Sequence, residues 1–121
     1  MVLNTDKDFY FPGEPVRIRL FKLNNSFRPI LLTYPTAQRY DFAVTGISGE
    51  VWRWSSGRLF APFVQQITLA PVQFLHYTET WPQVDNNGVR VPSGLYRITG
   101  WNIFEGFEGF PVLSTLIQIG G

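Results

Sequence analysis

Few side chains in this sequence of 121 residues could carry out acid–base or nucleophilic chemistry. The chain has one histidine, His76, and no cysteine. A chain without thiols forms neither disulfides nor thiolate metal sites. A histidine with no nucleophile motif nearby does not predict a catalytic triad. We therefore expect no catalytic residue and no enzymatic activity, and we interpret His76 as a surface residue of a strand.

The carboxylates do not form a convincing metal site either. Glu105 and Glu108 lie in a short Phe-Glu-Gly repeat, and Asp85 opens an Asp-Asn-Asn-Gly turn. Calcium takes about six or more oxygen ligands in proteins. Neither segment supplies that many, so the sequence predicts no metal site and no cofactor.

Composition and charge narrow the classes of partner. Ten Lys and Arg residues against nine Asp and Glu residues give a formal net charge of +1. No block of basic residues is present, which argues against nucleic-acid binding. No apolar run approaches the roughly 20 residues of a membrane-spanning helix, so we expect no membrane insertion. The hydrophobic fraction of 45% is enough for a core, and the length predicts one domain, 1–121.

Apolar and polar residues alternate with a period of two along most of the chain, which predicts strands. Val16, Ile18 and Leu20 alternate with Arg17 and Arg19 in one such segment. The predicted strands span 2–5, 15–23, 30–34, 39–46, 50–55, 64–69, 73–79, 94–103 and 112–119.

Turn residues separate these strands. Pro12-Gly13 fits a type II turn, Ser48-Gly49 fits a tight hairpin, and Asp85–Gly88 is rich in residues that tolerate left-handed backbone. Seven to nine short strands with turns between them predict an all-β, immunoglobulin-like antiparallel sandwich without disulfides. A small barrel is the alternative.

Two long connections are candidate binding loops. Residues 55–63 contain Arg58, Leu59 and Phe60, a basic residue followed by apolar ones, and a protease cleft could accept such a segment in extended form. The structural alternative is a crossover whose Phe60 and Phe63 close the end of the sandwich. Residues 104–110 carry three aromatic residues that water would solvate poorly, so they should dock on the domain or on a partner. These are Phe104, Phe107 and Phe110.

Several blocks together resemble a known family. They are Arg39–Val44, the Val-Trp-Arg-Trp-Ser block at 51–55, Trp81-Pro82 and the Pro-Ser-Gly-Leu-Tyr block at 92–96. In this order they are similar to the bacterial intracellular proteinase inhibitor family (BsuPI-like). The resemblance implies a disulfide-free immunoglobulin-like sandwich in the cytoplasm that inhibits a subtilisin-type serine protease. If residues 55–63 are the inhibitory loop, replacing Arg58 and Leu59 by Gly should weaken inhibition more than stability.

The N-terminal segment favours a different hypothesis. Residues 5–16, with their Asp-Lys-Asp and Tyr-Phe-Pro-Gly-Glu sequences, resemble the opening of bacterial extracellular immunoglobulin-like domains. This alternative is a non-inhibitory interaction or tethering module of a larger protein, secreted or on the cell surface. The sequence also leaves homo-oligomerisation open, because antiparallel sheets have edges that can pair.

Overall fold

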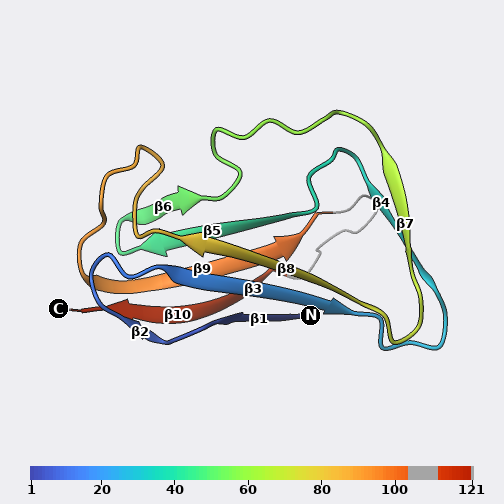
Figure 1. The fold of residues 1–121 in the computed structure, drawn as a ribbon, viewed down its shortest axis with the longest axis horizontal. Helices are drawn as coiled ribbons and strands as arrows, with labels where there is room; N and C mark the ends of the chain where they lie inside the picture. Colours follow the sequence, from blue (N-terminus) through green and yellow to red (C-terminus); the bar gives the residue numbers. More distant parts are fainter. Residues whose placement is uncertain (104–111, 121) are drawn as a thin grey trace.

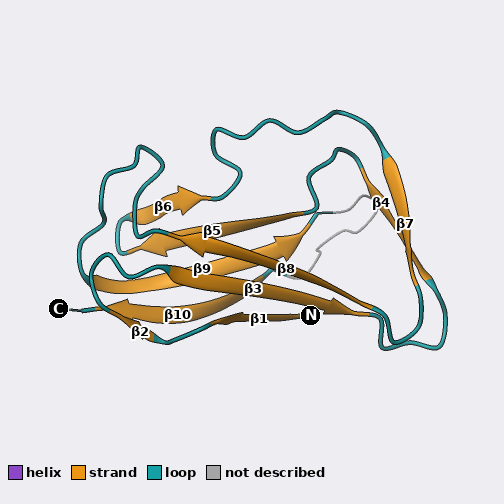
Figure 2. Cartoon of the chain, viewed as in Figure 1, coloured by secondary structure: helices purple, strands orange, loops and turns teal. Residues whose placement is uncertain are grey.

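The computed structural model describes residues 1–103 and 112–120, which contain strands and loops and no helix (Figure 2). Accordingly, this part of the chain has no helix able to span a membrane. The ten strands are β1 (Val2–Thr5), β2 (Phe9–Tyr10), β3 (Val16–Leu23), β4 (Ile30–Tyr34), β5 (Tyr40–Gly46), β6 (Gly49–Arg53), β7 (Gln65–Leu69), β8 (Phe74–Trp81), β9 (Gly94–Asn102) and β10 (Leu113–Ile119). The predicted all-β class is confirmed, as are most of the predicted strands to within a few residues.

Two sheets form a sandwich. Sheet A has the order β1-β3-β8, and sheet B has the order β2-β10-β9-β5-β6. The remaining strands, β4 and β7, pair with each other in a separate two-stranded sheet C. Sheet C lies at the right-hand end of the molecule in Figure 1, where it extends beyond the sandwich. The arrangement confirms the predicted immunoglobulin-like sandwich.

The core consists of the residues that the alternation places on the inner faces. On β3, Val16, Ile18 and Leu20 are fully buried, whereas Arg17 between them is exposed. The opposing sheet contributes Phe42, Val44, Tyr96, Ile98, Ile117 and Ile119. Burying one such side chain stabilises the fold by about 1.5–3 kcal/mol. The core is therefore large enough to hold the sandwich together without disulfides.

One pairing differs from the antiparallel arrangement that the sequence predicts. After β1 the chain crosses to sheet B, where Phe9 and Tyr10 of β2 run parallel to Gln118 and Ile119 of β10. Two-residue strands carry too little alternation to be detected in a sequence. For this reason the strand count is ten rather than seven to nine, and one edge of sheet B is parallel.

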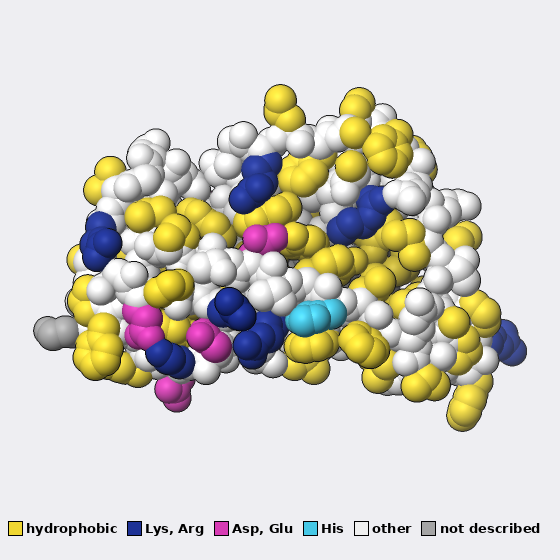
Figure 3. Space-filling view, viewed as in Figure 1, with side chains coloured by type: hydrophobic (Ala, Val, Ile, Leu, Met, Phe, Trp, Pro, Cys, Tyr) yellow, Lys and Arg dark blue, Asp and Glu magenta, His cyan; other side chains and the backbone are white. Residues whose placement is uncertain are grey.

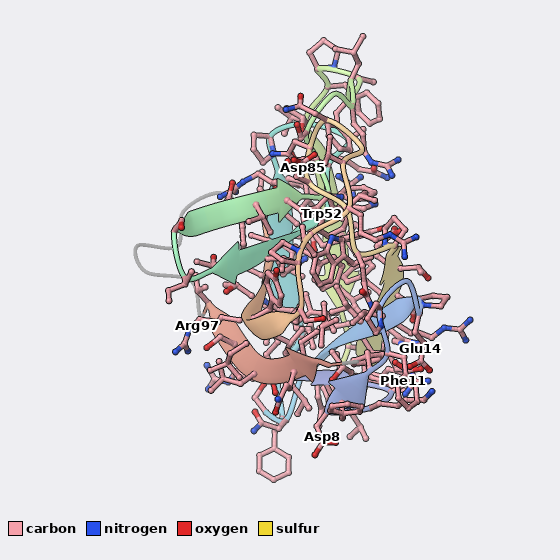
Figure 4. All side chains as sticks on the ribbon, turned by 90° about the vertical axis from the view of Figure 1, so that its left-hand side faces the viewer. Asp8, Phe11, Glu14, Trp52, Asp85 and Arg97 are labelled. Atoms are coloured by element: carbon pink, nitrogen blue, oxygen red, sulfur yellow. The ribbon has the colours of Figure 1, made fainter. Side chains whose placement is uncertain are left out.

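The buried side chain of Gln83 joins the turn between β2 and β3 to the β8–β9 connection. Figure 4 labels Phe11 and Glu14 on the turn and Asp85 on the connection. The side chain of Gln83 donates to the carbonyls of Phe11 and Glu14 and accepts from the N–H of Gly13. Glu14 N–H also donates to Phe11 O at 3.0 Å, and Gly13 has φ +83°, which confirms the predicted turn. These bonds fix the turn against the β8–β9 connection.

Candidate functional site

The connection between β6 and β7 is a long exposed loop that crosses the top of the molecule in Figure 1. It spans residues 54–64 and links sheet B to sheet C. Loops that a rigid scaffold holds in place are where binding residues concentrate. The loop includes the predicted candidates Arg58, Leu59 and Phe60.

A buried carboxylate anchors the first part of the loop. Asp41 Oδ1 accepts hydrogen bonds from the backbone N–H groups of Ser55 at 3.1 Å and Phe42 at 2.9 Å. Its Oδ2 accepts from Ser55 Oγ at 2.5 Å and lies 3.7 Å from a guanidinium nitrogen of Arg53. A buried carboxylate with several donors is well satisfied, so the loop leaves β6 in a fixed direction.

The middle of the loop is held by Trp54. The Arg58 guanidinium lies 4.3 Å from the centroid of the Trp54 ring, and Arg58 Nε–H donates to the Trp54 carbonyl at 2.8 Å. The Phe60 ring packs against the same indole, with 5.8 Å between centroids. Two residues that flank Leu59 therefore contact one aromatic side chain, an arrangement that we call the Trp54 clamp.

Leu59 projects away from the protein. Its side chain is 99% exposed, and no turn or strand is assigned to residues 58–64. A fully exposed leucine gains nothing from folding. The clamp thus presents one apolar side chain on a short segment outside the strands.

A backbone contact fixes the far end of the loop. The Ala61 carbonyl accepts from Ala37 N–H at 2.9 Å and from Phe63 N–H at 3.0 Å. Pro62, which lies between Ala61 and Phe63 in the sequence, has a restricted φ. Phe63 is half-exposed. Phe60, in contrast, is partly buried and packs on Trp54. Closure of the sandwich end by Phe60 and Phe63 stays a prediction.

An aromatic stack supports the clamp from below. The ring of Tyr40 lies 4.7 Å from Trp54 and 4.5 Å from Tyr77, measured between centroids. Tyr40 OH donates to a carboxylate oxygen of Glu79. Burial, and secondarily this carboxylate, raise the pKa of Tyr40 well above its usual value. The phenol therefore stays neutral and keeps the hydrogen bond at physiological pH.

Other sequence candidates lie elsewhere. Phe104, Phe107 and Phe110 fall outside the described residues. His76 is exposed and stacks on Phe21 with 4.4 Å between ring centroids, as expected for a residue on the outer face of a strand. In residues 1–103 and 112–120, no three His, Cys, Asp or Glu side chains gather where they could hold a metal ion.

Sequence reasoning missed how the loop is held. Trp54 packs against core residues, and it also binds the loop. The spacing of four residues between Trp54 and Arg58 was a weak signal for their contact, and nothing in the sequence pointed to Asp41 as the anchor of Ser55.

Solved structures define the class of fold. The β-glucosidase from Listeria innocua superposes with a TM-score of 0.52 at 13% identity, over 99% of this chain and 16% of that one. The alkylpurine DNA glycosylase AlkC from Pseudomonas fluorescens gives 0.54 at 12% identity, over 99% and 29%. The CARDB domain of the PF1109 protein from Pyrococcus furiosus gives 0.50 at 13% identity, over 97% and 87%. At such identities the likeness shows the β-sandwich fold alone.

The family is shown by the sequence match. Residues 3–106 match the BsuPI family, described as intracellular proteinase inhibitors. The chain belongs to this family, as its blocks of aromatic residues predicted. The family description gives the inhibition of proteinases as the activity of its members. No curated protein matched the chain.

Proposed function

We propose that this protein inhibits a subtilisin-type serine protease by placing residues 58–60 in the protease cleft. One observation carries the proposal: Leu59 is 99% exposed between two residues that are both bound to Trp54. A protease binds its substrate as an extended segment with one side chain in a specificity pocket. A loop whose backbone is already held in place loses less conformational entropy on binding.

The chemistry of the loop supports this role. Leu59 offers an aliphatic side chain to an apolar pocket, and the anchors at Ser55 and Ala61 hold the backbone on both sides. These non-covalent contacts replace the disulfides that small inhibitors often use. The family description and the absence of cysteine agree with action in the cytoplasm.

A second candidate function rests on the structural comparisons. The two enzymes contain this fold as 16% and 29% of longer chains, which favours a non-inhibitory module that holds other domains or proteins together. Such a module would not protect a chromogenic peptide from hydrolysis.

The test is a titration of subtilisin with the purified protein, with hydrolysis of a chromogenic peptide as the readout. Leu59→Ala should raise the inhibition constant about tenfold to a hundredfold, because an anchoring side chain contributes about 1.5–3 kcal/mol when buried. Its melting temperature should not change. The matched control is Ile47→Ala, since Ile47 is 104% exposed on the β5–β6 hairpin.

Each outcome separates the hypotheses. Inhibition by the parent protein that Leu59→Ala weakens and Ile47→Ala does not would support the loop. Inhibition that is equal in all three proteins would exclude Leu59 and direct the search to Phe104, Phe107 and Phe110. No inhibition of several serine proteases would refute the proposed function and favour the tethering module.

A further inference from the structure

Edge strands are the places where a β-sandwich can accept another strand, and most edges of this one are blocked. At the edge of sheet B, Asn86 N–H donates to Val51 O at 3.1 Å and Asn86 Oδ1 accepts from Arg53 N–H at 2.9 Å. At the other edge, β2 has two residues. The strands of sheet C have five residues each and are bracketed by prolines, namely Pro29, Pro35, Pro62 and Pro71.

The edge strand β8 has none of these protections. It is eight residues long, contains no proline or lysine, and pairs only with β3. In the part of the chain that the structure describes, no other segment makes a backbone hydrogen bond to Phe74–Trp81. Alternate N–H and C=O groups along this strand are therefore available to an added strand.

Behind this edge, the inner side is aromatic. Tyr77 of β8 stacks on Tyr40, which in turn packs on Trp54. Glu79, the one charged residue of β8 on this side, is engaged by Tyr40 OH. Figure 3 shows hydrophobic side chains gathered between the histidine and the top of the molecule, with basic side chains among them. Apolar side chains of an added strand would find a matching surface here.

The outer side of the same edge is basic. Arg17 and Arg19 of β3 are opposite Thr80 and Thr78 of β8, which are neutral. None of the outward positions of β3 or β8 carries a carboxylate. An added strand would lie about 10 Å from β3, twice the spacing of neighbouring strands. Acidic side chains on it could meet the two arginines across the threonines.

We propose that β8 binds an extended peptide by strand addition, and that the peptide alternates apolar residues with acidic ones. The apolar side chains face the aromatic stack and the acidic side chains face Arg17 and Arg19. Backbone hydrogen bonds give affinity in this mode, and the alternating side chains give specificity. The proposal does not depend on protease inhibition, because the peptide pairs with β8 and not with the loop at 54–64, of which only Trp54 belongs to the aromatic stack.

The probe is an acetylated and amidated peptide of sequence Thr-Val-Glu-Val-Glu-Val-Thr, titrated into the isotope-labelled protein and followed by NMR. We expect shifts and slowed hydrogen exchange in the amides of β8. Two N-methylated versions, one at the valines and one at the glutamates, block opposite edges of the peptide. One of them should bind at least about tenfold more weakly than the unmethylated peptide, and the other should bind with the same affinity as that peptide, because only one set of N–H groups faces β8.

A charge exchange tests the outer side. Arg19→Glu should weaken binding of the acidic peptide about fivefold and improve binding of the same peptide with lysines in place of glutamates. The matched control is Arg97→Glu, because Arg97 is exposed on the outer face of sheet B. Arg97→Glu should change neither the affinity for the acidic peptide nor the affinity for the lysine peptide.

Two results would overturn the proposal. Equal effects of the two N-methylated peptides would exclude strand addition. A dimer in sedimentation experiments, paired through β8 and not dissociated by the peptide, would show that a second copy of the chain occupies this edge instead. Leu59→Ala should leave peptide binding unchanged, so failure of the inhibitor hypothesis and failure of this one are distinguishable.

Discussion

Arg58→Ala should weaken protease inhibition although Leu59 remains in place. The guanidinium contributes a cation–π contact with Trp54 and one hydrogen bond to the Trp54 carbonyl. An exposed cation–π pair is worth about 0.5–1 kcal/mol and a hydrogen bond about 0.5–1.5 kcal/mol. The loop would then have to be ordered on binding at a cost of about 1–2 kcal/mol, which raises the inhibition constant about five- to thirtyfold.

The assay combines inhibition with the dynamics of the free protein. In Arg58→Ala the NMR order parameters of the Leu59 and Phe60 backbones should fall before any protease is added, because one half of the clamp is gone. Arg58→Lys keeps the charge but lacks the Nε–H donor, so it should fall between the parent protein and the alanine variant. Arg28→Ala, which removes an exposed arginine from another loop, is the control.

A specific result would refute this reasoning. If Arg58→Ala weakens inhibition while the order parameters of Leu59 and Phe60 stay as high as in the parent protein, Arg58 contacts the protease directly and does not order the loop. If inhibition and the order parameters are both unchanged, the clamp contributes nothing, and Ser55 and Ala61 alone hold the loop.

Three further predictions concern stability. Asn24 is fully buried, and its side chain bonds to Leu69 O, Arg28 O and Ser26. Asn24→Ala should therefore lower the free energy of unfolding by about 2–4 kcal/mol in urea titrations. The control Asn25→Ala, at an exposed position, should change it by less than about 0.5 kcal/mol. Val72 has φ +65° and is 79% exposed. Because a β-branched residue is strained at this φ, Val72→Gly should raise the free energy of unfolding by about 1 kcal/mol. An unchanged or lower value would contradict this prediction. Burial, and secondarily the carboxylate of Asp6, raise the pKa of Tyr10 from 10.0 to about 12. The unfolded state therefore loses this proton at a lower pH than the folded state, and the free energy of unfolding should fall as the pH rises from 10 to 12. Tyr10→Phe should make that fall less steep.

The regular part of the fold could be predicted because its signal is local. In β3, buried residues alternate with more exposed ones from Val16 to Phe21, and this periodicity is present in the order of the residues. The turn at Pro12-Gly13 and the Asx turn at Asp85, where Asn87 N–H donates to the Asp85 side chain at 2.9 Å, were predictable for the same reason.

What could not be predicted depends on contacts between distant residues. Gln83 has φ +60° and binds the turn at Phe11–Glu14 some 70 residues away. Val72 lies in the left-handed region because its N–H and the N–H of Asn24 bond across two loops. Propensity favours neither residue at positive φ. Tertiary hydrogen bonds override that preference, and a single sequence does not reveal them.

The candidate site could be predicted from the sequence only in part. That the connection after β6 is exposed could be predicted, but that Leu59 is its projecting residue could not, because this depends on which neighbours bind Trp54. Ordering the backbone of one residue costs about 1–2 kcal/mol, so holding residues 58–60 in one conformation costs about 3–6 kcal/mol. The cation–π contact and the hydrogen bond of Arg58 to Trp54, the packing of Phe60 on Trp54 and the bond of Ala61 to Ala37 are worth about 0.5–1.5 kcal/mol each, together about 2–6 kcal/mol, and nearly balance this cost. We infer that the free loop is ordered only when all of these contacts are present, and that a disulfide-free inhibitor depends on the whole set.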